Sequence, residues 1–583
     1  MSQRRTSPLC LTLALAGVVA AIGCTAVPET IDDATTTGTV STAYGGDPTL
    51  TKIGTYKNGG GAVEISAFDK KSKRLFMVNS ASSPPKVEVL DIANPGAAAL
   101  VGTIVEAGQG VPNSVAIHKG LVAVAWEAID RQQNGKVIFY DAKTLAKLGE
   151  ATVGAVPDNL VFNKKGDKVL VANEGEPANN YTYDPEGSVT IIDVDQRRHG
   201  WEFDATTVRF LPSTPIVNSA SVRIYGGGGT FGGVTSPPST PAQDFEPEYI
   251  SIDDDGKTAY VTLQENNAIA VLDIKSKKFT KVIGLGFKDH SLPGNGADMS
   301  DRDGPGSTAL LGNIQNWPVK GMYQPDTISH FKERGKNYLI MANEGDSREW
   351  GSFVEEARVA SLVPPKDAAG NYIPTAGKLR VDHPAVLDGS AADNARLGRL
   401  TVTTKGIATD ANGSFIDLYA LGARSFTVRE TNGNIVYDSG DSIEQKIHQL
   451  LPGFENSDQS AAPAPDSRSD NKGPEPEGLT VAKIRGTNYA FIGLERVGGV
   501  LMYDLDDPRH PRFITYVNNR NFTDATAPGD LGPEGLMVIS AKDSPTRRPI
   551  LVVSNEISGS ATFYQINGGG HGGGDDDCDG EDD

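Results

Sequence analysis

The chain has 583 residues, of which 38% are hydrophobic and 22% are charged, a composition typical of globular proteins. Its net charge of −20 at pH 7 excludes a general nucleic-acid binder and favours a cation-binding or secreted protein. The 66 glycines and 35 prolines indicate many turns, and the length is sufficient for one large repeat domain.

The N-terminus has the pattern of an export signal. Arg4 and Arg5 precede an apolar stretch at residues 11–20, and Ala21-Ile22-Gly23-Cys24 follows as a lipobox-like end. Residues 1–24 are therefore predicted to be a lipoprotein-type signal peptide, with lipid attached at Cys24. The alternative is a cleaved ordinary signal peptide. The Thr/Ala-rich residues 25–48 are predicted to form a flexible tether, which places the protein at the cell envelope or, without the lipid, in the periplasm or outside the cell.

One phrase recurs along the rest of the chain. A proline followed by an acid opens a strand, a turn follows, and a second strand ends in Asn-Glu or an equivalent pair. The copies are Pro157-Asp158 to Asn173-Glu174, Pro247-Glu248 to Gln264-Glu265, Pro325-Asp326 to Asn343-Glu344, Pro476-Glu477 to Leu494-Glu495, and Pro533-Glu534 to Asn555-Glu556. Two degenerate copies precede them, Glu64 to Asn79-Ser80 and Pro112-Asn113 to Trp126-Glu127.

Third and fourth strands follow several copies, as at residues 86–92 and 100–106, or 268–273 and 279–286. Seven copies of a four-stranded unit predict an all-β, seven-bladed β-propeller over residues 49–567. The last copy has no fourth strand of its own, and residues 51–57 read as a strand without a neighbour. We expect this N-terminal strand to complete the last blade and close the ring, which leaves no open sheet edge.

Insertions interrupt the repeat at about residues 226–243, a Gly/Ser/Pro/Thr-rich loop, and at residues 351–405. The second insertion is expected to return as a hairpin of residues 415–420 and 425–430. Ser442 is expected to cap a short helix, residues 443–450. The Gly/Asp-rich tail, residues 568–583, is predicted to be disordered.

The repeated acids are the candidate functional residues, because both acids of each phrase could face one end of a propeller channel. Crowded carboxylates repel unless cations compensate, and oxygen ligands without Cys or paired His favour Ca²⁺. The predicted metal ligands are Asp158, Glu174, Glu248, Glu265, Asp326, Glu344, Glu477, Glu495, Glu534 and Glu556. The alternative is that these acids merely cap turns at strand ends. Asp298-Met299-Ser300-Asp301-Arg302-Asp303-Gly304 is a second candidate cation loop, or a solvated acidic turn.

Cationic residues stand near these acids in the sequence, and they could bind a phosphate or act as internal counter-ions. The phosphate-binding candidates are Arg348, Arg424, Arg496 and Lys472. No nucleophile elbow, Walker loop, dinucleotide fingerprint or HExxH zinc helix occurs in the sequence, so no catalytic residue is assigned.

Several motifs in combination resemble the choice-of-anchor I family of secreted bacterial propellers, which is related to the mesenchyme-specific cell surface glycoproteins. They are Ala172-Asn173-Glu174-Gly175-Glu176-Pro177, Gly321-Met322-Tyr323-Gln324-Pro325-Asp326, Ala342-Asn343-Glu344-Gly345-Asp346, Gly422-Ala423-Arg424-Ser425-Phe426, residues 468–478 and Asn555-Glu556. The resemblance covers residues 50 to 567. It implies a propeller displayed through one of several kinds of anchor, and it brings no settled reaction.

A weaker resemblance to phytase-like propellers rests on the Pro-Glu-Gly-Leu phrases at 476–479 and 533–536. It implies a Ca²⁺-dependent phosphoric-ester hydrolase in which calcium and arginine neutralise phosphoryl oxygens. The alternative is a non-catalytic cell-surface binding or adhesion module with structural calcium. We expect a monomer that meets the membrane only through its lipid, with a phosphate ester or an envelope ligand as its partner.

Overall fold

The computed structural model describes residues 39–41, 46–179, 181–226, 229–231, 234–236, 238–306 and 308–568. Strands dominate the described part of the chain, so the all-β prediction is confirmed. The α-helices described are α1 (Pro241–Asp244), α2 (Pro384–Leu387) and α3 (Ser442–Leu450). Short 3₁₀ helices are η1 (Pro95–Ala97), η2 (Ser219–Ser221), η3 (Val359–Leu362) and η4 (Ser390–Ala392).

Seven antiparallel sheets in the described residues share one plan, in which four strands pair in order. We number them sheets 1 to 7. Sheet 1 is β3 (Ser66–Asp69), β4 (Arg74–Asn79), β5 (Lys86–Asp91) and β6 (Ala99–Ile104). Sheet 2 is β7 (Pro112–His118), β8 (Leu121–Trp126), β9 (Asn134–Asp141) and β10 (Lys147–Ala155). Sheet 3 is β11 (Pro157–Phe162), β12 (Lys168–Asn173), β13 (Ser188–Arg197) and β14 (Gly200–Arg209).

The remaining four sheets follow the same order, apart from insertions. Sheet 4 is β18 (Pro247–Ile252), β19 (Thr258–Leu263), β20 (Ala268–Asp273) and β21 (Lys278–Gly284). Sheet 5 is β24 (Ile328–Glu333), β25 (Lys336–Asn343), β31 (Ser425–Glu430) and β32 (Ile435–Asp438). Sheet 6 is β33 (Pro476–Ile484), β34 (Thr487–Leu494), β35 (Val500–Asp504) and β36 (Arg512–Val517). Sheet 7 is β37 (Pro533–Ile539), β38 (Ile550–Asn555), β39 (Ser560–Asn567) and β2 (Thr49–Lys57).

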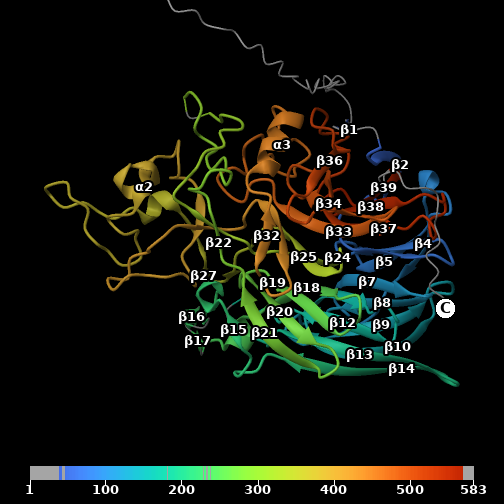
Figure 1. Ribbon diagram of the computed structural model, residues 1–583. Helices are drawn as coiled ribbons and strands as arrows, with labels where there is room; N and C mark the ends of the chain where they lie inside the picture. The colour runs from blue at the N-terminus through green and yellow to red at the C-terminus, as the bar shows by residue number, and fades with distance from the viewer. Residues whose placement is uncertain are drawn as a thin grey trace, which may run out of the picture.

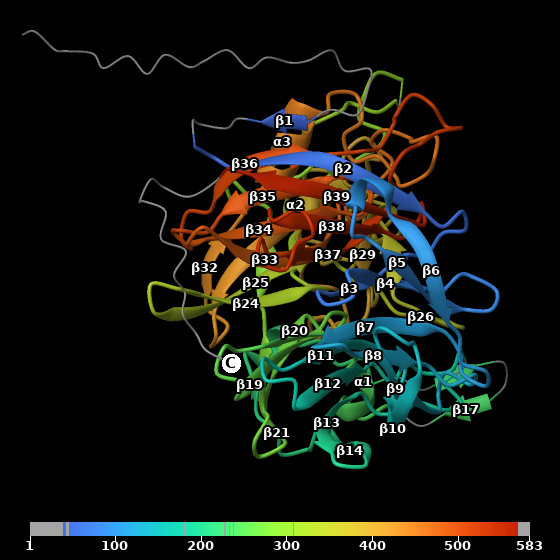
Figure 2. The ribbon, with the colours of Figure 1, turned by 90° about the vertical axis from the view of Figure 1, so that its right-hand side faces the viewer.

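The N-terminal strand completes the last sheet. β2 pairs antiparallel with β39, from Thr49 opposite Asn567 to Lys57 opposite Ser560, so the pairing predicted for this strand is confirmed (Figure 2). A shorter strand, β1 (Thr39–Ser41), extends sheet 6 by pairing with β36 and falls within the predicted tether. The predicted signal peptide with Cys24, residues 25–38 and 42–45 of the tether, and the tail beyond Gly568 lie outside the described residues.

The central strands of the sheets are apolar on both faces because each sheet packs between two others. All six residues of β8 are buried, and alternate side chains point to opposite sides. Val122 and Val124 pack with Phe76 of sheet 1, whereas Ala123 and Ala125 join the cluster of sheet 3. These strands are therefore continuously apolar. They do not show the alternation of apolar and polar residues that is typical of a sheet with one solvent-exposed face.

Successive sheets are joined in order, and the last meets the first. First strands contact one another from β3 through β7, β11, β18, β24, β33 and β37, and β37 contacts β3. The hydrophobic clusters follow the same succession. Val552 and Phe563 of sheet 7 share a cluster with Leu75, Met77 and other residues of sheet 1.

Insertions add a separate body beside the sheets, seen with α2 in Figure 1. Its five-stranded sheet is β22 (Phe287–Asp289), β23 (Lys320–Met322), β30 (Tyr419–Ala420), β29 (Thr401–Thr403) and β28 (Glu356–Arg358). Trp317, Val359 and Leu400 belong to its own hydrophobic core. Smaller additions are β15 (Ile216–Val217) beside β21 and the hairpins β16 (Gly229–Phe231) with β17 (Val234–Ser236), and β26 (Glu349–Trp350) with β27 (Phe353–Val354).

The predicted hairpin of residues 415–420 with 425–430 is wrong. β30 pairs with β23 and β29, and β31 pairs with β25 and β32, so the two segments belong to different sheets. Between them the backbone passes Glu344 so closely that a Cβ at Gly422 would lie 2.0 Å from the Glu344 carbonyl oxygen, which only glycine permits. Helix α3 is confirmed, with Asp441 rather than Ser442 at its N-cap.

In the part of the chain that the structure describes, no helix is both long and apolar enough to cross a membrane.

Burial of Leu50 predicts that β2 stabilises the whole fold. Leu50 is 2% exposed and packs in the cluster shared by sheets 6 and 7. Leu50→Ala is expected to lower the free energy of unfolding by about 2–5 kcal/mol, because it leaves a cavity in this cluster. The control Leu100→Ala, at a side chain 47% exposed, should change stability by less than about 0.5 kcal/mol. The midpoints of urea unfolding measure both changes in stability. Equal midpoints for the two variants would contradict the packing of Leu50 in this cluster.

Candidate functional site

A β-bulge places the first acid of the repeated phrase. Pro157 pairs with Asn173, but the regular pairing resumes only at Leu160, so Asp158 lies in an irregular stretch. The same interruption follows Pro247, Pro476 and Pro533 in sheets 4, 6 and 7. A bulge bends its strand and re-aims a side chain, and these bulges fall immediately at the acids.

The asparagine that ends the second strand is structural. Asn173 is fully buried and its amide donates to Ser188 Oγ and to Thr190 Oγ1, at 3.2 and 3.1 Å. Asn343 and Asn555 likewise donate to the serine that opens the third strand. These bonds fix the second strand to the third, so the acid that follows is held at the strand end.

The backbone of the second acid is bonded to the start of the phrase. The amide of Glu174 donates to the carbonyl of Val156, the residue before Pro157, at 2.9 Å. Glu495 bonds in the same way to Glu475, at 2.9 Å. Both acids of a phrase are thereby fixed at the same end of their sheet.

The ten predicted ligands form one electrostatically linked group. Glu248, Glu265, Glu344 and Glu495 are buried, and the other six are half-buried. Glu477 is influenced by acids of three phrases, among them Glu344 and Glu534. Glu534 is influenced in turn by Glu556 and Asp326, so acids from distant parts of the chain act on one another.

Burial and this crowding raise the pKa of most of these carboxyl groups. The pKa of Asp326 rises to about 7 through burial and the nearby Glu344 carboxylate. Burial, Glu475 and Glu344 raise that of Glu495 to about 8. The pKa values of Asp158, Glu248 and Glu477 are also raised, by burial first and by neighbouring acids second.

Three of the acids are close enough to share one ion. Carboxylate oxygens of Glu344, Glu477 and Glu495 all lie within 4.8 Å of one another. Glu477 Oε2 is buried without a hydrogen-bond partner. Hard cations prefer such oxygen ligands, and Ca²⁺ binds them at about 2.3–2.6 Å in flexible geometries. The donor set therefore fits a divalent cation.

Beside this cluster, Glu475 is the centre of an ion network. Its carboxylate is fully buried and lies 2.9 Å from Lys472 Nζ and 2.9 Å from Arg496 Nε. Arg468 donates to its other oxygen, and Lys472 also reaches Glu344 at 2.7 Å. Burial alone would raise the pKa of Glu475, but these three cations outweigh it and lower the pKa to about 2.

The four predicted phosphate-binding cations fall into two groups. Lys472 and Arg496 lie at the three-acid cluster, where Arg496 also pairs with Glu495 at 3.0 Å. Arg348 is 2% exposed, pairs with Glu246 at 2.8 Å and stacks over the Tyr225 ring. Arg424 is 3% exposed and bonded to Glu444 and to backbone carbonyls. The guanidinium groups of Arg348 and Arg424 are thus engaged as internal counter-ions.

Glu475 and Glu246 form ion pairs with cationic side chains, but the sequence analysis did not select them. Both precede the proline of a phrase, in Glu475-Pro476-Glu477 and Glu246-Pro247-Glu248. Both are buried beside arginine. The acid-Pro-acid pattern is a signal that could have identified them.

A separate hollow of about 980 Å³ lies at the opposite strand ends, along turns of sheets 1 to 3. Asp69, His118, Asp141 and Trp201 are among its lining residues. None of the ten predicted ligands lines it.

Repeated four-stranded sheets with acids gathered at one end define an all-β repeat protein with a candidate cation site. The chain belongs to the choice-of-anchor I domain family, whose model matches residues 64–508. The family resemblance noted in the sequence is confirmed.

Two curated relatives and two solved structures are similar to the chain. Gigasin-3a of Magallana gigas is 29% identical over 194 residues, which are 31% of this chain and 68% of that protein. The mesenchyme-specific cell surface glycoprotein of Strongylocentrotus purpuratus is 27% identical over 300 residues, 46% of this chain and 36% of that protein. Kuenenia stuttgartiensis hydrazine synthase is 14% identical, with a TM-score of 0.41 over 88% of this chain and 97% of that one. The Myceliophteria thermophila Cps50 (Swd1) β-propeller domain is 9% identical, with a TM-score of 0.39 over 89% and 100%.

The raised pKa values predict that the cation-free protein loses stability as pH rises from 5.5 to 8. Glu495 holds its proton to about pH 8 when folded but releases it near pH 4.5 when unfolded, so its contribution is present at low pH and lost through the folded pKa. In EGTA, Glu495→Gln should reduce this loss by up to roughly 3 kcal/mol, measured by urea unfolding at both pH values. The exposed control Glu430→Gln should follow the wild type. Identical pH dependence in all three proteins would contradict the assignment.

Proposed function

We propose that this chain is a surface-displayed, seven-bladed β-propeller that binds Ca²⁺ where the acids of its repeats converge. The observation that carries the proposal is the approach of Glu344, Glu477 and Glu495 within 4.8 Å, with Glu477 Oε2 lacking a partner. Calcium would supply the positive charge that these carboxylates require when all of them are ionised.

Two observations support the propeller architecture. Each sheet shares a hydrophobic cluster with the next, and sheet 7 shares one with sheet 1. The succession of contacts between first strands also returns from β37 to β3. In such a ring the first strands line the centre, and the acids lie at one mouth of the channel.

The surface location is part of the proposal. The relative from Strongylocentrotus purpuratus is named as a cell surface glycoprotein, and the family to which this chain belongs is described as a choice-of-anchor domain. Lipid attachment at Cys24 would provide the anchor, and the acidic net charge supports a monomer without nucleic acid as partner. The partner would be an envelope or extracellular ligand.

Calcium binding is tested by calorimetric titration of protein first stripped with EGTA, at pH 8. Wild-type protein should bind Ca²⁺, and Glu477→Gln should weaken binding at this site at least about tenfold, because it removes charge and a ligand oxygen from the cluster. Asp254→Asn, at an exposed residue of a turn in sheet 4, is the matched control and should leave binding unchanged. Equal binding by wild type and Glu477→Gln would refute the site.

A second candidate function is calcium-dependent hydrolysis of a phosphoric ester. Lys472 and Arg496 beside the three acids favour it, since a phosphoryl group would meet both cations and a bound metal there. The same cations are bonded to Glu475, however, which leaves them less free for a ligand. The geometry therefore supports cation binding more strongly than hydrolysis.

Hydrolysis is tested with p-nitrophenyl phosphate and phytate, in calcium and in EGTA. An enzyme should show turnover that requires calcium and that falls at least about a hundredfold in Lys472→Met, because the positive charge facing a phosphoryl group is lost. Asp254→Asn again serves as control. Absence of turnover in a protein that still binds calcium would leave the non-catalytic binding or adhesion module as the function.

A further inference from the structure

The hollow along sheets 1 to 3 is lined by cationic turns, although the chain as a whole has a net charge of −20. The cationic residues of its lining are Lys71, Arg74, Lys119, Lys143 and Lys165. The four lysines are exposed, and none of them forms an ion pair with another described residue. Their charges are therefore free to meet an anionic ligand.

The acids of the hollow are bonded within their own turns. Asp69 Oδ2 accepts from the backbone amide and the hydroxyl of Ser72, at 2.8 and 2.6 Å. Asp141 Oδ1 accepts from the backbone amide of Thr144 at 2.7 Å. The other two acids of the lining, each bonded to a nearby residue of its own turn, are Asp91 and Asp167. These carboxylates therefore stabilise the turns and do not pair with the four lysines.

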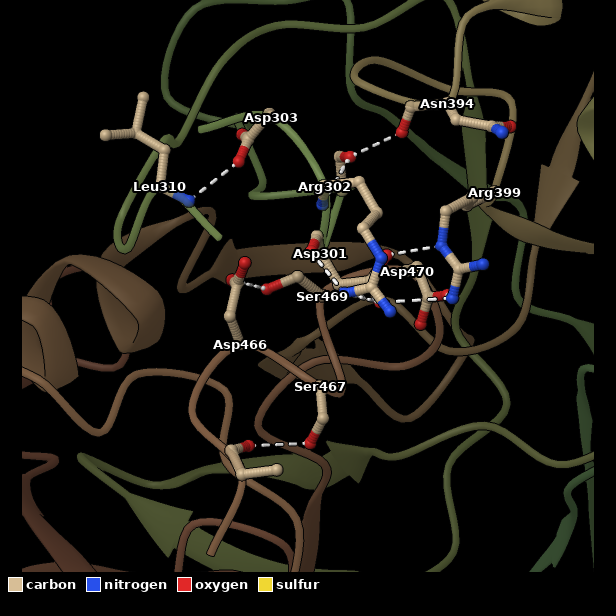
Figure 3. A network of polar contacts seen from close by, with 12 residues as sticks. Asp301, Arg302, Asp303, Leu310, Asn394, Arg399, Asp466, Ser467, Ser469 and Asp470 are labelled. Atoms are coloured by element: carbon tan, nitrogen blue, oxygen red, sulfur yellow. Dashed lines mark hydrogen bonds and ion pairs between the residues drawn. The ribbon is translucent and has the colours of Figure 1, made fainter. Parts of the chain in front are cut away.

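The insertion beside the sheets shows the opposite arrangement. Arg399 donates to the carboxylates of Asp301 and Asp470, and Figure 3 shows the three side chains joined. Asp301 belongs to the predicted cation loop, so the protein itself supplies a positive charge there. In the hollow, no described carboxylate does the same for the four lysines.

An acidic segment of the same chain follows the last strand. Residues 575–583 hold seven acids, and the glycine-rich residues 568–574 precede them. Strand β39 begins at Ser560, opposite Asn555 at the acid-bearing end of sheet 7, and it ends at Asn567. The hollow lies at this second end of the sheets. The chain therefore leaves sheet 7 at the end of the fold where the lysines gather.

Printed contacts connect this exit point to the hollow. Asn567 Oδ1 accepts from Arg548, in the turn between β37 and β38, at 2.8 Å. Asp543 of the same turn pairs with Lys70 of the β3–β4 turn at 3.4 Å. The β3–β4 turn also supplies Lys71 to the lining of the hollow. One turn of sheet 7 therefore separates the exit point from the lysine-lined surface.

Residues 568–574 are long enough to cross this separation. A glycine-rich segment of seven residues spans roughly 15 Å on average and at most about 24 Å. Neighbouring sheets pack about 10 Å apart, and the nine residues that follow can extend over up to about 30 Å. A tether this short also holds the acids at an effective concentration in about the millimolar range.

We propose that the acidic segment 575–583 docks in the lysine-lined hollow of its own chain. Each exposed ion pair is weak alone, but several acids that face four unpaired lysines act together. A segment of this composition has no apolar core of its own, so it binds through charge. The docked segment occupies the hollow, and an acidic partner reaches these lysines only by displacing it. The site shares no residue with the three-acid cluster and stands independently of the proposed function.

The test uses the full-length chain with Cys10→Ser and Cys24→Ser, in which Cys578 has the only thiol. A bimane label on Cys578 reports contact with Trp201, which lines the hollow, because tryptophan quenches bimane fluorescence on contact. EGTA keeps calcium from both the acidic segment and the three-acid cluster. Fluorescence should be quenched at low salt and rise at least about twofold in 1 M NaCl, where the Debye length is about 3 Å.

Charge reversal in the hollow should release the segment. Lys119→Glu combined with Lys165→Glu should raise the low-salt fluorescence to the high-salt value, because repulsion replaces attraction. Lys366→Glu combined with Lys378→Glu is the matched control, at lysines of the insertion that do not line the hollow, and should leave the quenching unchanged. Quenching that survives charge reversal in the hollow would overturn the proposal.

Trp201→Phe separates contact in the hollow from other sources of quenching. Phenylalanine keeps an aromatic ring beside Phe203, with which Trp201 stacks at 6.2 Å between ring centroids, so the wall of the hollow is retained. This variant should lose the quenching. Full quenching without Trp201 would place Cys578 elsewhere and contradict docking in the hollow.

Carbodiimide coupling of the unsubstituted protein provides a measurement that needs no variant. The reagent joins a carboxylate to a lysine amine in contact with it as an amide, and the carbodiimide takes up the water that is lost. Mass spectrometry should find links from residues 575–583 to lysines of the hollow, and fewer such links in 1 M NaCl. Links only to lysines outside the hollow, or no links, would refute docking.

Discussion

The fold depends on covering both faces of the central strands. Residues of β8 alternate between a cluster shared with sheet 1 and a cluster shared with sheet 3, and an isolated sheet would leave one apolar face in water. Each sheet therefore needs a neighbour on either side. The last sheet finds one in the first, and it takes its fourth strand from the N-terminal side of the repeats. Segments distant in sequence are tied together by the same requirement.

That packing brings the strand ends together, and the repeated acids come with them. In sheets 3, 4, 6 and 7 a bulge follows the proline at the position of the acid, and in sheets 3, 5 and 7 a buried asparagine fixes the end of the second strand. These features hold the carboxylates of the phrases in fixed places. Their proximity is unfavourable when all are ionised. Around Glu475 the protein supplies three cations and the carboxylate stays ionised, whereas Glu477 and Glu495 are left with raised pKa values. A bound cation would offset the repulsion between the Glu477 and Glu495 carboxylates.

The insertions are part of this arrangement rather than appendages to it. Their sheet has its own core, yet Arg424 bonds the carbonyl of Asp298 to the segment that leads into β33. Lys472, near the end of that segment, pairs with Glu344, which directly follows β25 of sheet 5. The position of the insertion and the charge balance of the three-acid cluster are therefore linked through one stretch of backbone.

The sequence by itself determined the all-β class, most first and second strands, the pairing role of β2 and the acids that gather. Those features follow from local alternation, turn residues and repetition, which act between near neighbours. Only the tertiary structure decided that Arg348 and Arg424 are engaged internally while Lys472 and Arg496 reach the acid cluster, and that Glu475 is surrounded by cations. It also decided that Tyr419–Ala420 pairs with β23 and not with β31. Charge pairing and the pairing of short strands depend on distances between segments that are far apart in the chain. The local sequence does not specify those distances.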